Sequence, residues 1–129
     1  MSQDLPKLPD LLHTVREFID EITPQLDGRD RYHAMCASYL LDLARRELAL
    51  APRIDADEQS MLAHFIGMQA DLEHGYATLA RAIRSGSLDE RWDQLMTLLL
   101  HHVVNKVRVT KPDHLHPMHR ADDAPGDTA

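Results

Sequence analysis

Apolar residues recur every three or four positions along most of the chain, and this spacing is what most limits the folds available to it. Leu11, Val15 and Phe18 occupy one face of a helix because they are four and three residues apart. Four similar stripes follow: Cys36, Leu40, Leu43 and Leu50; Met61, Leu62, Phe65 and Ile66; Leu72, Tyr76, Leu79 and Ile83; and Trp92, Met96, Leu99 and Val103. No strand-like alternation competes with them, so the sequence predicts an all-α fold.

Proline and glycine mark the expected helix ends. Pro24 and the Asp27-Gly28 turn end the first helix, and Pro52 is expected to close a second helix over about residues 30–50. Asp55 followed by Glu58 resembles a capping box that would start a third helix. Ser85-Gly86 ends the fourth, since glycine adopts the left-handed conformation of a C-terminal cap. About five helices with short loops predict an antiparallel bundle.

The periodic pattern stops near Thr110. The 129-residue chain fits one domain, which we place at residues 1–110. Residues 111–129 combine prolines with aspartates and histidines and show no period. They predict a flexible acidic, His-containing tail.

Charge and composition exclude several classes of function. The formal net charge is −7 and no basic patch with interleaved aromatics occurs, so nucleic-acid binding is not expected. No segment approaches the roughly 20 apolar residues of a membrane span. Cys36 is the single cysteine, and the first residues do not resemble a signal peptide, so a cytoplasmic protein is expected.

Two opposite charges fall on apolar stripes. The second helical stripe continues to Glu47, and the last one continues to Lys106. An isolated buried charge costs several kcal/mol and a partner offsets part of that, so we hypothesise a partly buried Glu47–Lys106 ion pair, joined by Arg46 or Arg84. Exposure at helix edges is the alternative, because long charged side chains extend from apolar surfaces into water.

The nine histidines raise the question of metal binding. An aspartate precedes a histidine by three residues at Asp10/His13, Asp30/His33, Asp71/His74 and Asp113/His116. Helical di-iron proteins use Glu-x-x-His with further glutamates, whereas the first three aspartates lie near expected helix starts and fit helix caps better, and the fourth pair lies in the tail. His33 and Cys36 make two zinc ligands where four are usual. The sequence therefore predicts no metal site.

Common enzyme signatures are missing from the sequence. It contains no Gly-rich phosphate loop, no G-x-S-x-G and no H-E-x-x-H. This favours a protein without a catalytic residue set and without a bound cofactor.

Several stretches resemble an uncharacterised family of small bacterial proteins, a domain of unknown function. They are Pro9–Phe18, Arg31–Leu48, Ala82–Gly86 and the Lys106 region, and together they span about residues 4–112. The polar positions carried over from the resemblance are Arg31, His33, Arg46, Glu47, Arg84 and Lys106. The chain departs from the family pattern at Ser38, where asparagine is common, and at Lys111–His114, where Asn-Pro and a later tyrosine are usual.

The resemblance also implies a biological setting. Such proteins are often encoded beside acyl-CoA dehydrogenases and aminoglycoside-phosphotransferase-like kinases, which implies an accessory protein that binds one of these partners. The first hypothesis is thus a non-catalytic interaction module associated with acyl-CoA metabolism. The alternatives are a ligand- or metal-binding bundle with an unrecognised activity, and a homo-oligomeric scaffold that buries an apolar helix face between copies.

Overall fold

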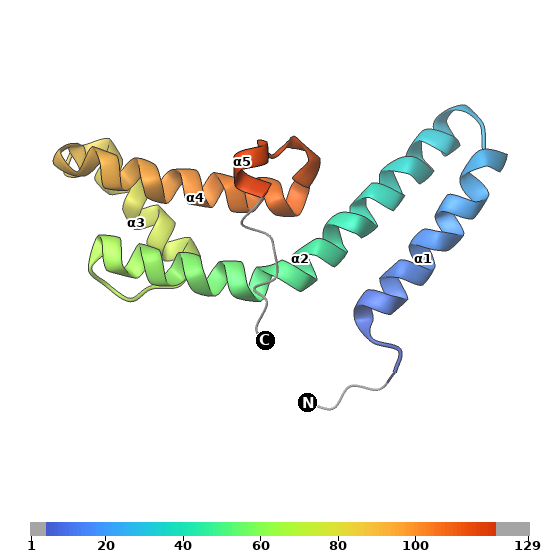
Figure 1. Cartoon of the computed structure of the whole chain (residues 1–129), viewed down its shortest axis with the longest axis horizontal. Helices are drawn as coiled ribbons and strands as arrows, with labels where there is room; N and C mark the ends of the chain where they lie inside the picture. Colours follow the sequence, from blue (N-terminus) through green and yellow to red (C-terminus); the bar gives the residue numbers. More distant parts are fainter. Residues whose placement is uncertain (1–4, 121–129) are drawn as a thin grey trace. The chain divides into compact units, whose positions relative to one another are not determined.

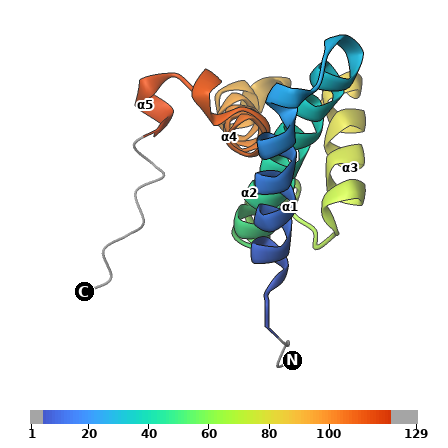
Figure 2. The same cartoon turned by 90° about the vertical axis from the view of Figure 1, so that its right-hand side faces the viewer.

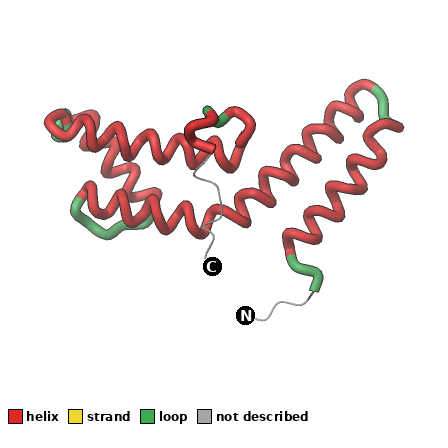
Figure 3. The backbone as a smooth tube through the Cα atoms, in the orientation of Figure 1, coloured by secondary structure: helices red, strands yellow, loops and turns green. Residues whose placement is uncertain are grey.

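The computed structural model describes residues 5–120, and its regular structure there is helical throughout (Figure 3). The all-α prediction is confirmed. The helices are labelled in Figure 1: α1 (Leu8–Ile22), α2 (Gly28–Ile66), α3 (Leu72–Ser85), α4 (Trp92–Thr110) and α5 (Pro117–Arg120). Short 3-10 turns lie at Thr23–Gln25, Asp89–Arg91 and Pro112–His114. No helix within residues 5–120 is long and apolar enough to cross a bilayer.

The helix α2 continues through Pro52, so the expected helix end there is wrong. Proline removes one backbone donor from a helix interior and crowds the carbonyl four residues before it. The flanking segment Leu48–Ala51 consists of leucine and alanine, which favour helix strongly enough to continue it. Asp55 and Glu58 consequently lie inside α2 and form no capping box.

The chain divides into two compact units, Met1–Ala51 (unit 1) and Pro52–Ala129 (unit 2). Their boundary falls beside Pro52, so α2 contributes residues to both. The expected single domain over residues 1–110 spans both units and stays a prediction.

In unit 1, α1 and the first part of α2 run antiparallel and side by side (Figures 1 and 2). The bonds between these two helices are polar. Arg16 Nη2 lies 3.1 Å from Asp42 Oδ2, and the Ser38 hydroxyl donates to Asp20 Oδ1 at 2.6 Å. Arg45 Nη1 lies 3.2 Å from His13 Nδ1. We call these six residues the polar seam.

The apolar stripes of unit 1 lie away from the polar seam. Val15 is two residues after His13, and Phe18 is two residues after Arg16. Two residues turn a helix by about 200°, which places the stripe of α1 on its opposite side. Phe18 is accordingly 60% exposed, and no residue of α1 is fully buried. Ser38, a polar residue, is the one buried side chain among residues 5–51.

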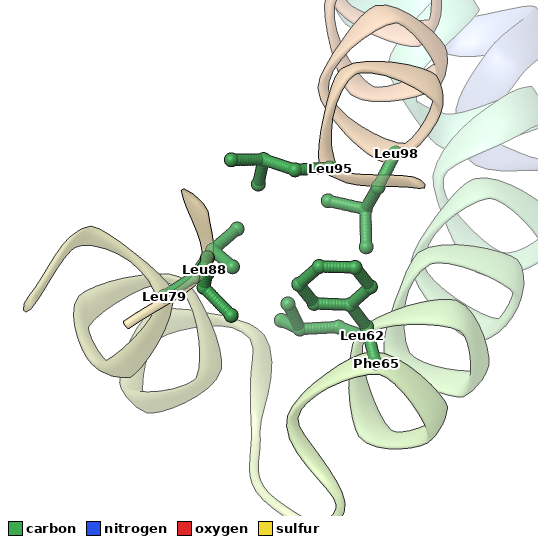
Figure 4. Packing of buried hydrophobic residues seen from close by; sticks show 6 residues of the cluster. All are labelled: Leu62, Phe65, Leu79, Leu88, Leu95 and Leu98. Carbon is green, nitrogen blue, oxygen red and sulfur yellow. The ribbon is translucent and has the colours of Figure 1, made fainter. Parts of the chain in front are cut away.

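Unit 2 has an apolar core between the second part of α2, α3 and α4. Figure 4 shows six buried side chains pointing into it: Leu62, Phe65, Leu79, Leu88, Leu95 and Leu98. Gly75 lets α3 approach α2 closely, because a Cβ at this position would overlap the Leu62 side chain. The sequence stripes of Leu62 and Phe65 and of Leu79 are thus confirmed as core.

The rotation of α4 differs from the expected one. Leu95 and Leu98 face the core, whereas Trp92, Met96 and Val103 are exposed. Leu99 of the predicted stripe does pack against the core, and the core side of α4 continues through the polar residues His102 and Asn105. Because these polar residues interrupt the apolar pattern, the sequence did not indicate which side of α4 faces the core.

Residues 111–120, which the sequence assigns to the tail, contain two short helices. Leu115 is 5% exposed, and the Arg120 guanidinium donates to the carbonyls of Leu115 and Asp113 at 2.8 and 2.7 Å. Pro112 and Pro117 each stand at the start of a helical turn, where the missing N–H costs nothing. Residues 121–129 of the predicted tail lie outside the described residues.

Candidate functional site

Three polar side chains from three helices meet within unit 2. The Tyr76 hydroxyl of α3 donates to Glu58 Oε1 of α2 at 2.5 Å. The same carboxylate oxygen pairs with Nδ1 of His102 from α4. The Tyr76 and His102 rings lie 4.4 Å apart between centroids. We call these residues the Glu58 cluster.

Helical spacing explains why the three residues face one another. Glu58 precedes Leu62 by four residues and therefore shares the core face of α2. Tyr76 precedes Leu79 by three residues on α3, and His102 follows Leu98 by four on α4. The polar cluster thus continues the apolar core along the same three helix faces.

Burial makes the hydrogen bonds of this cluster energetically important. The Glu58 side chain is 7% exposed and the His102 side chain 23%. Desolvation, together with the neighbouring Glu58 carboxylate, raises the pKa of Tyr76 well above 10. Tyr76 therefore remains a neutral hydrogen-bond donor throughout the physiological pH range.

The cluster fixes the orientation of the His102 ring. A carboxylate on Nδ1 holds a histidine in one position and leaves Nε2 as the nitrogen for a further interaction. Glu58 and His102 would supply a metal ion with only two ligands of the usual kinds. Within residues 5–120, no group of three or more histidine, cysteine or carboxylate side chains is arranged to hold one. The geometry suits positioning of the His102 ring.

Sequence reasoning missed this cluster for two identifiable reasons. The sequence pattern assigns Glu58 to a capping box because Pro52 is expected to end the helix before it. The apolar stripe of α4 predicts another rotation of this helix, in which His102 does not face the core. The spacing of Glu58, Leu62 and Phe65 by four and three residues was the available signal, since it puts a carboxylate on a core face.

A second feature of unit 2 is the exposed side of α4. Trp92, Met96, Leu100 and Val103 are 55%, 44%, 53% and 53% exposed. Steps of four, four and three residues place them along one side, which we call the outer stripe. Lys106 follows Val103 by three residues and is also exposed, so the outer stripe ends at a positive charge.

A shallow groove of about 240 Å³ lies between α2 and α4 and includes Met61, Phe65 and Arg91 in its lining. The Arg91 guanidinium lies 4.1 Å from the centre of the Phe65 ring and donates to the Phe65 carbonyl at 3.0 Å. Its Nε also donates to Gln94 at 3.1 Å. Arg91 therefore caps the C-terminal end of α2. Because this side chain already has partners in the fold, we interpret the groove as a feature of helix packing and not as a binding site.

Comparison with protein families identifies the chain. A family model described as a domain of unknown function, DUF6285, matches residues 24–114. The chain belongs to this family. The match includes all of α2, α3 and α4, and so contains both the Glu58 cluster and the outer stripe. No match was found among curated proteins or among solved structures.

The family match differs in extent from the resemblance inferred from sequence. It begins at residue 24, so α1 and the Pro9–Phe18 motif lie outside the matched DUF6285 region. The matched region contains buried polar groups in both units. Glu58 and Asn105 are buried in unit 2, and Ser38 is buried in unit 1.

The six polar residues carried over from the resemblance fall in both units. Arg31, His33, Arg46 and Glu47 belong to unit 1, whereas Arg84 and Lys106 belong to unit 2. Within α2, Arg31 and Glu47 are separated by about 24 Å of helix. Glu47 and Lys106 are each exposed, so neither lies in the core of its own unit. Their pairing, and the six residues as one site, stay predictions.

The structure gives one of the aspartate–histidine pairs a local role. Asp71 is the N-terminal cap of α3 and accepts the backbone N–H of His74 at 2.8 Å. Its carboxylate also lies 2.8 Å from the His74 ring. The backbone hydrogen bond and the His74 ring together lower the pKa of Asp71. The cap interpretation is thus confirmed for this pair.

Proposed function

We propose that this member of the DUF6285 family is a non-catalytic helical interaction module. The supporting observation is the outer stripe of α4, where four large apolar side chains are exposed in line. Amphipathic helices dock into apolar grooves of partners through residues spaced in this way. Tryptophan and methionine are enriched at protein interfaces, and both occur here.

The charge at the end of the outer stripe favours a partner with an acidic rim. Lys106 lies one turn beyond Val103, and no acidic residue within residues 5–120 forms an ion pair with it among those observed. A carboxylate on the partner would fix the register of the docked helix. Such rim charges contribute to specificity and association rate more than to affinity.

The partner class follows from the sequence resemblance. The resemblance implies acyl-CoA dehydrogenases and phosphotransferase-like kinases as partners. We therefore propose that the module binds an enzyme of acyl-CoA metabolism. A binding role is consistent with the Glu58 cluster being assembled from residues that also hold three helices together.

Co-expression with each candidate enzyme, followed by affinity purification, tests this function. The wild-type chain is expected to co-purify with one of them at fixed stoichiometry. Trp92→Ala and Met96→Ala should each weaken binding by about tenfold or more, because truncated anchors at interface centres cost over 1 kcal/mol. Met118→Ala, at a residue 68% exposed elsewhere, is the matched control. Co-purification that survives W92A and M96A would contradict the assignment of the outer stripe.

A second candidate function is a ligand-binding helical bundle, favoured by the Glu58 cluster. The His102 ring is fixed and partly exposed, as a ring that meets a ligand should be. A ligand that binds only the native protein raises its melting temperature. Divalent metals, inorganic anions and CoA thioesters should be compared, with His102→Gln as the variant. A melting temperature unchanged by all of them would count against this function.

A further inference from the structure

The exposed face of α2 in unit 1 is the starting point for a further inference. Cys36 and Leu40 flank Ser38 of the polar seam at two residues on either side. A turn of about 200° puts them on the side of α2 that faces away from α1. Leu40 is 59% exposed and Tyr32, on the same side, is 66% exposed. Among residues 5–51, no helix other than α1 packs beside α2, so no element of that part of unit 1 covers this face.

Charges of opposite sign stand at the two ends of this face. Arg29 precedes Cys36 by seven residues, and Glu47 follows Leu40 by seven. Seven residues are about two helical turns, so both charges are in line with the apolar residues between them. Both are exposed. The face therefore has a basic N-terminal end, an apolar middle and an acidic C-terminal end.

A surface with this pattern is complementary to itself when two copies run antiparallel. Arg29 of each copy then meets Glu47 of the other, and Cys36 meets Leu40. The pattern repeats under a two-fold axis near residue 38, as an isologous dimer interface requires. Arg29 and Glu47 of one chain are about 27 Å apart along the helix, so they cannot pair with each other.

We propose that the α2 face of Arg29, Tyr32, Cys36, Leu40, Leu43 and Glu47 binds a second copy of this chain, antiparallel, as a homodimer. The dimer covers the exposed side chains of Tyr32 and Leu40 and the half-buried side chains of Cys36 and Leu43. It also gives Glu47 a partner, Arg29 of the other copy. This surface shares no residue with the outer stripe, so the homodimer and the partner binding through α4 can be tested independently.

Charge reversal on the full-length chain tests the dimer, with sedimentation velocity over a concentration series as the measurement. The wild-type chain is expected to change from monomer to dimer as its concentration rises. Arg29→Glu and Glu47→Arg should each raise the dissociation constant by roughly tenfold, because each places two like-charged pairs at the interface. The double variant restores both pairs and should return to within about threefold of wild type.

Two further variants keep the result interpretable. Leu40→Lys should abolish the dimer, and circular dichroism establishes that the variant remains helical. Glu90→Arg makes the same charge change as E47R outside α2 and should leave the dimer intact. A chain that is monomeric at every concentration overturns the proposal, as does a dimer that the single reversals do not weaken. Association seen only with a co-expressed enzyme would assign the face to that enzyme and also overturn it.

Discussion

At the scale of single residues, the Glu58 carboxylate is a buried acidic group of unit 2. It is nearly excluded from water and depends on Tyr76 and His102 for its hydrogen bonds. Losing one partner of a buried carboxylate costs more than an average hydrogen bond, because the remaining charge stays desolvated. These residues should therefore affect stability out of proportion to their size.

Tyr76→Phe tests this dependence. It should lower the free energy of unfolding by about 1–3 kcal/mol at neutral pH, since the ring is retained and only the donor is lost. Tyr32→Phe, at an exposed tyrosine, is the matched control and should change little. Urea unfolding of both variants and the wild type provides the measurement. Equal stability of the two variants would show that the Tyr76 hydroxyl does not support Glu58.

The raised pKa of Tyr76 also predicts how the free energy of unfolding changes at alkaline pH. The pKa of Tyr76 is raised on folding, so the folded chain keeps this proton while an unfolded tyrosine loses it near pH 10. The stabilisation is complete below pH 10 and declines as the pH rises further. The decline between pH 9.5 and 11 should be smaller in Tyr76→Phe than in the wild type.

Among the helices, unbroken apolar spacing located α1 and α3 correctly, although the stripe of α1 is exposed. The ends of α1 and α3 and the core faces at Leu62, Phe65 and Leu79 follow directly from the pattern. The prediction failed at α2, which continues through Pro52, and at α4, where the buried Asn105 and the half-buried His102 lie on the core side. The first failure concerns local helix propensity, because the leucines and alanines before Pro52 continue the helix, and the second concerns polar residues on the core side of α4. Together they prevented prediction of the Glu58 cluster.

Pro52 is the residue at which α2 has the least local support. Pro52→Ala restores a backbone donor and removes a proline penalty of about 3 kcal/mol, offset in part by a more flexible unfolded chain. The variant should thus be more stable by about 2 kcal/mol. Thermal unfolding followed by circular dichroism measures this, and Pro24→Ala, outside α2, is the control. A loss of stability in P52A would mean that the native backbone at residue 52 requires proline.

At the scale of the whole molecule, the two units are stabilised by different kinds of contact. Unit 2 has an apolar core with Leu79 and Leu95 almost completely buried. Unit 1 joins its helices through the polar seam, whose charged side chains remain partly in water although Ser38 is buried. A domain normally needs a shared apolar core to fold independently. Unit 1 should thus gain more stability than unit 2 from contact with a further surface, such as the second copy proposed above.

The polar seam has a consequence for the solvent conditions under which α1 stays folded. Mobile ions screen exposed charges, with a screening length of about 10 Å at 0.1 M and 3 Å at 1 M salt. Added sodium chloride should therefore speed amide hydrogen exchange in α1 while leaving the core amides of α3 nearly unaffected. Equal responses in the two helices would mean that α1 is held by apolar contacts. If α1 alone responds, as expected, ionic strength is a selective control that loosens unit 1 while unit 2 keeps its structure.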